Sequence, residues 1–259
     1  MSEARTTAVN RPAWVDLSSS DAGASRAFYS TLLGWSIEVS DDPQYGGYGI
    51  ARVGGADAAG VGPKMSPEAP TAWSLYIGTD DADELAKKVE AAGGTVIMAP
   101  FEVPGQGRMA VFQDPSGAFV SAWQASGMSG FASGGMGSFA WAELNARGVE
   151  KAIPFYEEVF GWTHRTSDMG ENMPPYTEFL HDGDSILGGM EMSPAVPAEV
   201  PSHWLVYFSV EDVDASHRTA VDAGATELLG PHDFPGGRFA ILADPEGAAF
   251  GLLRANPRE

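Results

Sequence analysis

The chain contains no cysteine, few basic residues and no long apolar run. Without cysteine it can form neither disulfides nor thiolate zinc sites, and it lacks a cysteine nucleophile. Its 15 Lys and Arg stand against 35 Asp and Glu, which leaves a net charge of −20. A nucleic-acid-binding surface needs a basic face to displace counterions. We therefore expect no nucleic-acid partner, and we interpret the acidity as a source of solubility.

The sequence shows no pattern typical of a membrane span or of a secretory signal. No stretch approaches the roughly 18 apolar residues that a membrane span requires, and residues 1–14 lack the apolar segment of a secretory signal. These features predict a cytoplasmic protein with no membrane partner. Of the 259 residues, 44% are hydrophobic and 19% charged. The length of the chain exceeds that of one average globular domain.

What the sequence does contain is an internal repeat, visible when WVDLSSSDAGASRAFYSTLLGW (14–35) is compared with WAELNARGVEKAIPFYEEVFGW (141–162). Later, GRMAVFQDPSGAF (107–119) matches GRFAILADPEGAA (237–249) at an offset of 130. Six residues of the first copy recur 127 positions later in the second. They are Trp14, Leu17, Phe28, Tyr29, Gly34 and Trp35, and in the same order their counterparts are Trp141, Leu144, Phe155, Tyr156, Gly161 and Trp162. The chain is a tandem duplication.

The repeat predicts two domains, at residues 12–124 and 138–254. Between them, residues 125–137 read ASGMSGFASGGMG, a glycine- and serine-rich composition typical of a flexible linker.

Each copy is predicted to follow the order βαβββ twice. The first strand (13–17, and 139–144 in the second copy) precedes a helix that Ser20 or Asp21 caps and Gly34 ends. The pattern restarts with a strand at 73–77 and a helix at 81–92. Further strands are expected near residues 48–53, 58–61, 95–98, 109–113 and 118–123.

Adjacent aromatics near a helix centre usually pack in the core, so we assign Phe28 and Tyr29, with their second-copy partners, to the core. The Asp-Pro-x-Gly sequences at Asp114 and Asp244 are expected to form tight turns that join the last two strands of each copy.

This combination of motifs resembles the vicinal oxygen chelate superfamily, the group of glyoxalases, bleomycin-resistance proteins and extradiol dioxygenases. The motifs are FY followed by GW after the first helix, AGG, and DPxG before the last strand. The chain is most similar to a two-domain actinobacterial branch, often labelled 27 kDa antigen or hydroxylase and found among antibiotic-biosynthesis proteins. The resemblance implies an α+β fold of four βαβββ modules, whose two mixed sheets curl into cups that hold a ligand or metal.

The metalloenzymes of that superfamily keep ligands at fixed strand positions, and this chain departs from them. Those positions hold Trp14, Trp141, Ser74, Leu205, Ser121 and Gly251. A divalent metal needs several imidazoles or carboxylates converging on one point, and all five histidines lie in the second half without a spaced pair. His203 with Glu191 could make only a poor site. We predict no metal and no cofactor.

Strand alternation then suggests what lines the cups. Asp16 and Glu143, the candidate catalytic carboxylates, share a face with the first-strand tryptophans, whereas Val15 and Leu17 point to the helices. Trp73 and Trp204 fall on the helix face. The predicted ligand-binding residues are Trp14, Ser74, Tyr76, Ser121, Trp141, His203, Leu205 and Tyr207. Indole and phenol suit a flat aromatic or hydrophobic ligand, but these side chains could equally fill the cups.

The residues leave three functions open. The first is a metal-independent binding protein that sequesters or carries a small aromatic or hydrophobic metabolite, such as an antibiotic or polyketide. The second is a metal-independent lyase, isomerase or hydroxylation-type enzyme with Asp16 or Glu143 as base, aided by Tyr76 or Tyr207. The third, a metal-dependent glyoxalase or dioxygenase, follows from the family name alone. A monomer and a homodimer are both compatible with the sequence, and Arg108 and Arg238 could gate a cup or form surface ion pairs.

Overall fold

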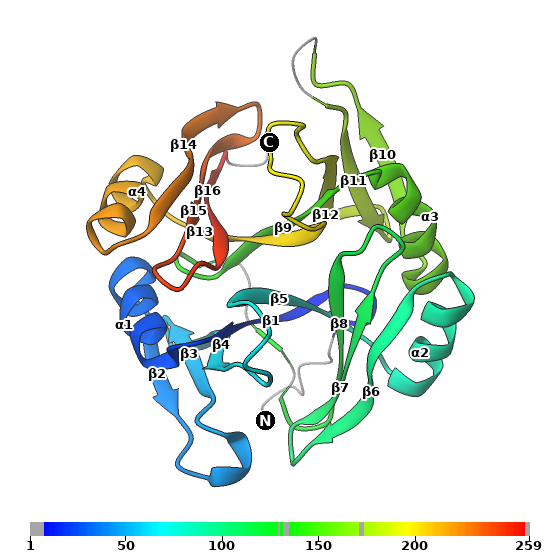
Figure 1. Cartoon of the computed structure of the whole chain (residues 1–259), viewed down its shortest axis with the longest axis horizontal. Helices are drawn as coiled ribbons and strands as arrows, with labels where there is room; N and C mark the ends of the chain where they lie inside the picture. The colour runs from blue at the N-terminus through cyan, green and yellow to red at the C-terminus, as the bar shows by residue number, and fades with distance from the viewer. Residues whose placement is uncertain (1–7, 129, 132–134, 171–173, 257–259) are drawn as a thin grey trace. The chain divides into compact units, whose positions relative to one another are not determined.

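The computed structural model describes residues 8–128, 130–131, 135–170 and 174–256. These residues form two eight-stranded mixed sheets and four α-helices, an α+β fold (Figure 1). The first copy comprises β1 (Pro12–Ser19), α1 (Ala22–Leu33), β2 (Ser36–Val39), β3 (Gly49–Val53), β4 (Ala56–Pro63), β5 (Ala72–Gly78), α2 (Ala82–Ala91), β6 (Thr95–Val103), β7 (Gly107–Gln113) and β8 (Phe119–Ala125). The second comprises β9 (Phe139–Ala146), α3 (Val149–Phe160), β10 (Thr163–Ser167), β11 (Tyr176–His181), β12 (Asp184–Glu191), β13 (His203–Ser209), α4 (Val213–Asp222), β14 (Thr226–Phe234), β15 (Gly237–Ala243) and β16 (Ala249–Ala255).

The two copies have the same topology, which confirms the duplication and the four βαβββ modules. The strand order is β2-β3-β4-β1-β5-β8-β7-β6 in one sheet and β10-β11-β12-β9-β13-β16-β15-β14 in the other. Within each module the first strand pairs in parallel with the last, as β1 does with β4. Each helix lies along the strands of its own module, for example α2 on β6 and β7 (Figure 1).

The helix ends follow the local chemistry of the sequence. Asp21 caps α1 by accepting a hydrogen bond from the backbone N–H of Ala24, and Gly34 ends it in the left-handed conformation. Asp81 and Asp212 cap α2 and α4 in the same way. By contrast, α3 has Gly148 at its N-cap without a side-chain cap of its own.

Two strands differ from the sequence prediction. The strand expected at 95–98 extends to Val103 as β6, because bulges carry its pairing with β7 past Met98. The short strand β2, with three of its four residues exposed, was not identified individually, since an exposed four-residue edge carries little hydrophobic signal.

Contacts divide the chain into two compact units, each of which contains modules from both copies. Unit 1 comprises Met1–Trp14, Leu75–Gly130 and Trp141–Trp204, and unit 2 comprises Val15–Ser74, Phe131–Ala140 and Leu205–Glu259. These units are defined by contacts, whereas the predicted domains 12–124 and 138–254 are defined by the repeat, so the domain boundaries stay a prediction. The predicted linker falls partly outside the described residues.

Each unit has an aromatic core built on a helix tyrosine. In unit 2, Tyr29 is fully buried and stacks on Trp35, with ring centroids 5.6 Å apart. In unit 1, Tyr156 stacks on Trp162 at 5.4 Å and 8°. Phe28 and Phe155 are also buried, which confirms the core assignment of these aromatics.

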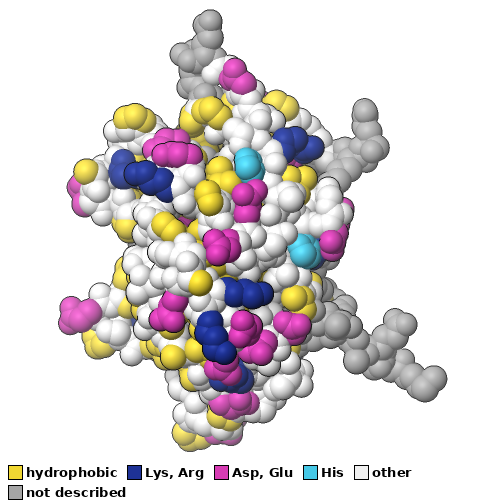
Figure 2. Space-filling view, turned by 90° about the vertical axis from the view of Figure 1, so that its right-hand side faces the viewer, with side chains coloured by type: hydrophobic (Ala, Val, Ile, Leu, Met, Phe, Trp, Pro, Cys, Tyr) yellow, Lys and Arg dark blue, Asp and Glu magenta, His cyan; other side chains and the backbone are white. Residues whose placement is uncertain are grey.

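None of the helices in the described parts of the chain is long and apolar enough to cross a membrane. On the face shown in Figure 2, Lys and Arg side chains lie among Asp and Glu side chains rather than in one basic patch.

Candidate functional site

In unit 2, strand alternation turns Asp16 away from the helix face. Its neighbours Val15 and Leu17 are buried in the core, and Asp16 is half-buried on the opposite face of β1. The hydroxyl of Tyr48 donates a hydrogen bond to Asp16 Oδ2 at 3.2 Å. Gly60 is the residue of β4 opposite Asp16, and a Cβ built there would collide with the Tyr48 hydroxyl. The glycine therefore lets the phenol cross the sheet face and reach the carboxylate.

Unit 1 repeats this arrangement, and here a tryptophan bonded to the tyrosine is a third member. The indole Nε1–H of Trp141 donates to the hydroxyl oxygen of Tyr176 at 2.9 Å. The Tyr176 hydroxyl is in turn hydrogen-bonded to Glu143, which also accepts from Asn145 Nδ2 at 3.2 Å. Gly188, opposite Glu143 on β12, again makes room for the phenol. We call Trp141, Tyr176 and Glu143 the indole–phenol–carboxylate relay.

The electrostatics of the relay keep the phenol protonated. Burial raises the pKa of Tyr176 well above its ordinary value, and the negative charge of Glu143 raises it further. Tyr176 therefore stays a hydrogen-bond donor to Glu143, which is itself only 8% exposed. A carboxylate held in this way can accept a hydrogen bond from a ligand or take up a proton.

The sequence analysis did not identify the two tyrosines and two glycines of these sites. Tyr48 and Tyr176 lie 128 positions apart, as do Gly60 and Gly188. Extending the repeat alignment through the loop between the first helix and the next strands would have found all four.

The predicted site residues are divided between the units. Unit 1 holds Trp14, Tyr76, Ser121, Trp141, Glu143 and His203, and unit 2 holds Asp16, Ser74, Leu205 and Tyr207. Five of them, Trp14, Tyr76, Ser121, Leu205 and Tyr207, are at most 5% exposed, whereas Ser74 and His203 are half-buried. Tyr76 pairs in register with Ser121. The helix-face assignment of the other two tryptophans is confirmed, since Trp73 and Trp204 donate to the core phenols of Tyr29 and Tyr156.

The residues present do not fit the divalent metal that the fold family implies. The Tyr207 ring lies over Gly251, so that a side chain at that ligand position would overlap the ring. Glu191 accepts hydrogen bonds from the backbone N–H groups of Gly148 and Val149, where it supplies the cap that α3 lacks. His203 contacts the carbonyl of Pro201 through Nδ1. Within the described residues, no group of three or more His, Asp or Glu could hold a metal ion.

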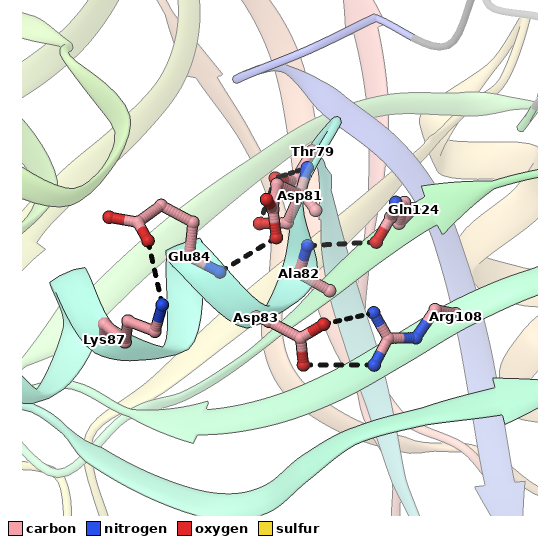
Figure 3. Close-up of polar contacts among 8 residues, drawn as sticks. All are labelled: Thr79, Asp81, Ala82, Asp83, Glu84, Lys87, Arg108 and Gln124. Carbon is pink, nitrogen blue, oxygen red and sulfur yellow. Dashed lines mark hydrogen bonds and ion pairs between the residues drawn. The ribbon is translucent and has the colours of Figure 1, made fainter.

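The matching arginines form surface ion pairs. Arg108 forms a bidentate ion pair with Asp83, in which Nη1 donates to Oδ2 at 2.6 Å and Nη2 donates to Oδ1 at 3.0 Å (Figure 3). Arg238 likewise forms a bidentate ion pair with Asp214 in the second copy. Hydrogen bonds from these guanidinium groups lower the pKa of Asp83 and of Asp214.

Comparison with known proteins agrees with this fold. The family model described as "Glyoxalase/Bleomycin resistance protein/Dioxygenase superfamily" matches residues 11–121 and 138–252, so the chain belongs to this superfamily. A solved structure with a TM-score of 0.65, the Mn(II)-bound glyoxalase from Novosphingobium aromaticivorans, is 19% identical and is matched over 94% of this chain and 81% of that chain. At that identity the likeness shows the fold alone.

Two relatives are similar over almost their whole length. "Putative glyoxylase CFP32" of Mycobacterium tuberculosis is 39% identical over 257 residues, covering 96% of both chains. "Anthracycline biosynthesis protein DnrV" of Streptomyces peucetius is 39% identical over 257 residues, covering 93% of this chain and 92% of that protein.

Proposed function

We propose that this chain binds a small aromatic or hydrophobic metabolite on the carboxylate-bearing faces of its sheets, and that it does so without a metal in order to sequester or carry the ligand. The observation that carries the proposal is the indole–phenol–carboxylate relay of Trp141, Tyr176 and Glu143. The relay offers aromatic surface together with a fixed hydrogen-bond acceptor, the combination typical of sites for flat ligands with a polar edge.

A polycyclic phenol or quinone is the ligand class that this chemistry favours. Its rings can stack on indole and phenol, and its hydroxyl groups can donate to the carboxylate. The name of the relative DnrV, an anthracycline biosynthesis protein, supports the same class. Both the chemistry of the site and the name of this relative are compatible with binding alone, without catalysis by the chain.

Binding can be tested by isothermal titration calorimetry with quinizarin, a dihydroxyanthraquinone, as the aromatic probe and decanoate as an aliphatic one. We expect saturable binding of quinizarin, with recovery of the unchanged compound. Glu143→Gln should weaken that binding about ten- to a hundredfold, because a hydrogen bond to a charged group contributes about 1.5–3 kcal/mol. Glu158→Gln makes the same chemical change on the exposed side of α3 and should leave affinity unchanged.

A second candidate function is a metal-independent enzyme of small-molecule metabolism that uses Asp16 or Glu143 as base. The observation that favours it is the direct hydrogen bond between each carboxylate and a tyrosine, Tyr48 or Tyr176, which could return a proton to the substrate. The double variant Asp16→Asn/Glu143→Gln tests whether either carboxylate acts as the base. If mass spectrometry finds the same product with this variant as with the unaltered chain, the carboxylates are not the base.

The proposal that the ligand is bound without a metal can be tested separately. The crowding at Gly251 and the cap formed by Glu191 support it. Elemental analysis of the purified protein should find no stoichiometric nickel, zinc, iron or manganese, and one equivalent of any of them would contradict the proposal.

A further inference from the structure

The second copy carries an aromatic cluster in unit 2 that the relay does not include. Phe239 on β15 lies at its centre, and three rings meet it edge-on: Tyr207, His232 and Phe234, with centroid separations of 6.3, 6.0 and 5.7 Å. The interplanar angles are 70°, 75° and 79°. Edge-to-face contacts of this kind are the arrangement that aromatic rings prefer.

Strand register places this cluster on one face of the sheet. Tyr207 pairs with Gly251, and Gly251 with Ile241, whereas Phe239 pairs with Leu253. Because alternate residues share a face, these side chains lie together on the side opposite the core.

That face is incompletely covered, in contrast to the other side of the same strands. Phe208 and Phe250, on the core side, are 0% exposed. On the cluster side four large apolar residues remain half-buried, namely Phe234, Phe239, Ile241 and Leu253. Half-exposed aromatic and aliphatic side chains gathered on one face mark a surface that a ligand can cover.

Gly251 sets the position of Tyr207 in this cluster. A Cβ at position 251 would collide with the tyrosine ring, so the ring can lie against the strand only because this residue is glycine. The first copy has Ser121, which carries a side chain, at the corresponding place opposite Tyr76.

The first copy also lacks the central ring. The pair His232 and Phe239 on β14 and β15 corresponds to Phe101 and Met109 on β6 and β7. Phe234, paired with Gly237, corresponds to Val103, paired with Gly107. The two copies therefore share a backbone but differ in where their rings lie, because the first copy has Met109 where the second has Phe239 and Trp123 where the second has Leu253.

We propose that the face of β13–β16 in the second copy selects a planar aromatic ligand, and that Phe239 is the residue that sets this preference. This inference rests on the proposed function and names the copy and the residue that give it specificity. A planar ligand meets the edges and faces of Phe239, Phe234 and Tyr207, and an aliphatic one gains no comparable ring contacts.

Exchanging residues between the copies tests the proposal in the full-length chain. Phe239→Met introduces the residue of the first copy, and Met109→Leu is the matched control in that copy. With quinizarin as the probe, calorimetry should show affinity about three- to tenfold lower for Phe239→Met, because ring contacts of this kind are worth that much in binding. Affinity for decanoate should not fall in Phe239→Met, and Met109→Leu should bind both probes unchanged.

Thermal unfolding of each variant controls for damage to the fold, and Phe239→Leu provides a second truncation if Phe239→Met is unstable. Equal quinizarin affinity in Phe239→Met and the unaltered chain, or an equal loss in Met109→Leu, would overturn the assignment to the second copy while the proposed function stands. If quinizarin and decanoate both fail to bind the unaltered chain, the proposed function and this inference fall together.

Discussion

Tyr29 donates a hydrogen bond to Asp244, which lies 215 positions further along the chain, across 3.0 Å. The same bond, at 2.8 Å, joins Tyr156 to Asp114. In each case the tyrosine belongs to the FY motif of one copy and the aspartate to the Asp-Pro-x-Gly turn of the other. The two copies therefore complete each other's buried polar contacts, and the two most recognisable motifs of the repeat interact across copies.

Each buried phenol is satisfied on both sides. Trp73 Nε1 donates to the Tyr29 oxygen at 2.9 Å, while the Tyr29 hydrogen goes to Asp244. Asp244 also accepts from the backbone N–H groups of Glu246 and Ala248, and so organises its own turn. This accounts for the polar atoms within an aromatic core, where an unpaired donor or acceptor is costly.

Removal of the phenol oxygen should therefore destabilise the fold. We expect Tyr29→Phe to lower the free energy of unfolding by about 1–3 kcal/mol, because it leaves an indole N–H and a carboxylate oxygen without a partner. Tyr156→Phe should behave alike, and urea denaturation measures both. Ser36→Ala deletes an exposed hydroxyl with a long 3.4 Å contact and should change stability by less than about 0.5 kcal/mol. Equal effects in Tyr29→Phe and Ser36→Ala would contradict this account.

Alkaline pH should unfold the chain through its buried tyrosines. Burial raises the pKa of Tyr29, Tyr156 and Tyr176 above the ordinary value of 10.0. Above that pH the unfolded chain loses these protons while the folded chain keeps them, so stability falls as pH rises, by about 1.4 kcal/mol per pH unit for each tyrosine. Urea midpoints at successive pH values measure the slope. Replacement of one of these three tyrosines by Phe should make the slope shallower. An unchanged slope would show that the replaced tyrosine does not contribute to the loss of stability at alkaline pH.

A side chain at Gly188 should disturb the relay. In Gly188→Ala the new Cβ would overlap the Tyr176 hydroxyl and come within 2.9 Å of Trp141 Nε1. We expect a loss of about 1–3 kcal/mol in stability from overpacking, with weaker quinizarin binding. Gly60→Ala should act similarly on Tyr48. As the control, a Cβ at Gly135 meets nothing within 4 Å, so Gly135→Ala should leave both measurements unchanged.

The ion pair of Arg108 and Asp83 should contribute nothing to ligand binding. Both side chains lie at the surface of α2 and β7 (Figure 3). Arg108→Gln should therefore keep quinizarin affinity, and its small effect on the urea midpoint should shrink as salt is added. A clear loss of affinity in this variant would favour the alternative in which the arginine gates the site.

The sequence by itself determined the parts of this protein that depend on neighbouring residues. The duplication, a helix cap at Ser20 or Asp21, the stop at Gly34 and the turn at Asp114 all follow from local conformational preference and repeated spacing. Strand alternation also placed Val15 and Leu17 in the core, because a period of two admits only two faces.

Only the tertiary structure decided which distant side chains meet. That Tyr176 reaches Glu143 depends on the register of β9 beside β12 and on Gly188 leaving the space open. That Tyr29 meets the aspartate of the other copy depends on how modules from both copies combine in one unit. Such contacts join residues that no local preference relates, and they form only when strand pairing and core packing bring their segments together.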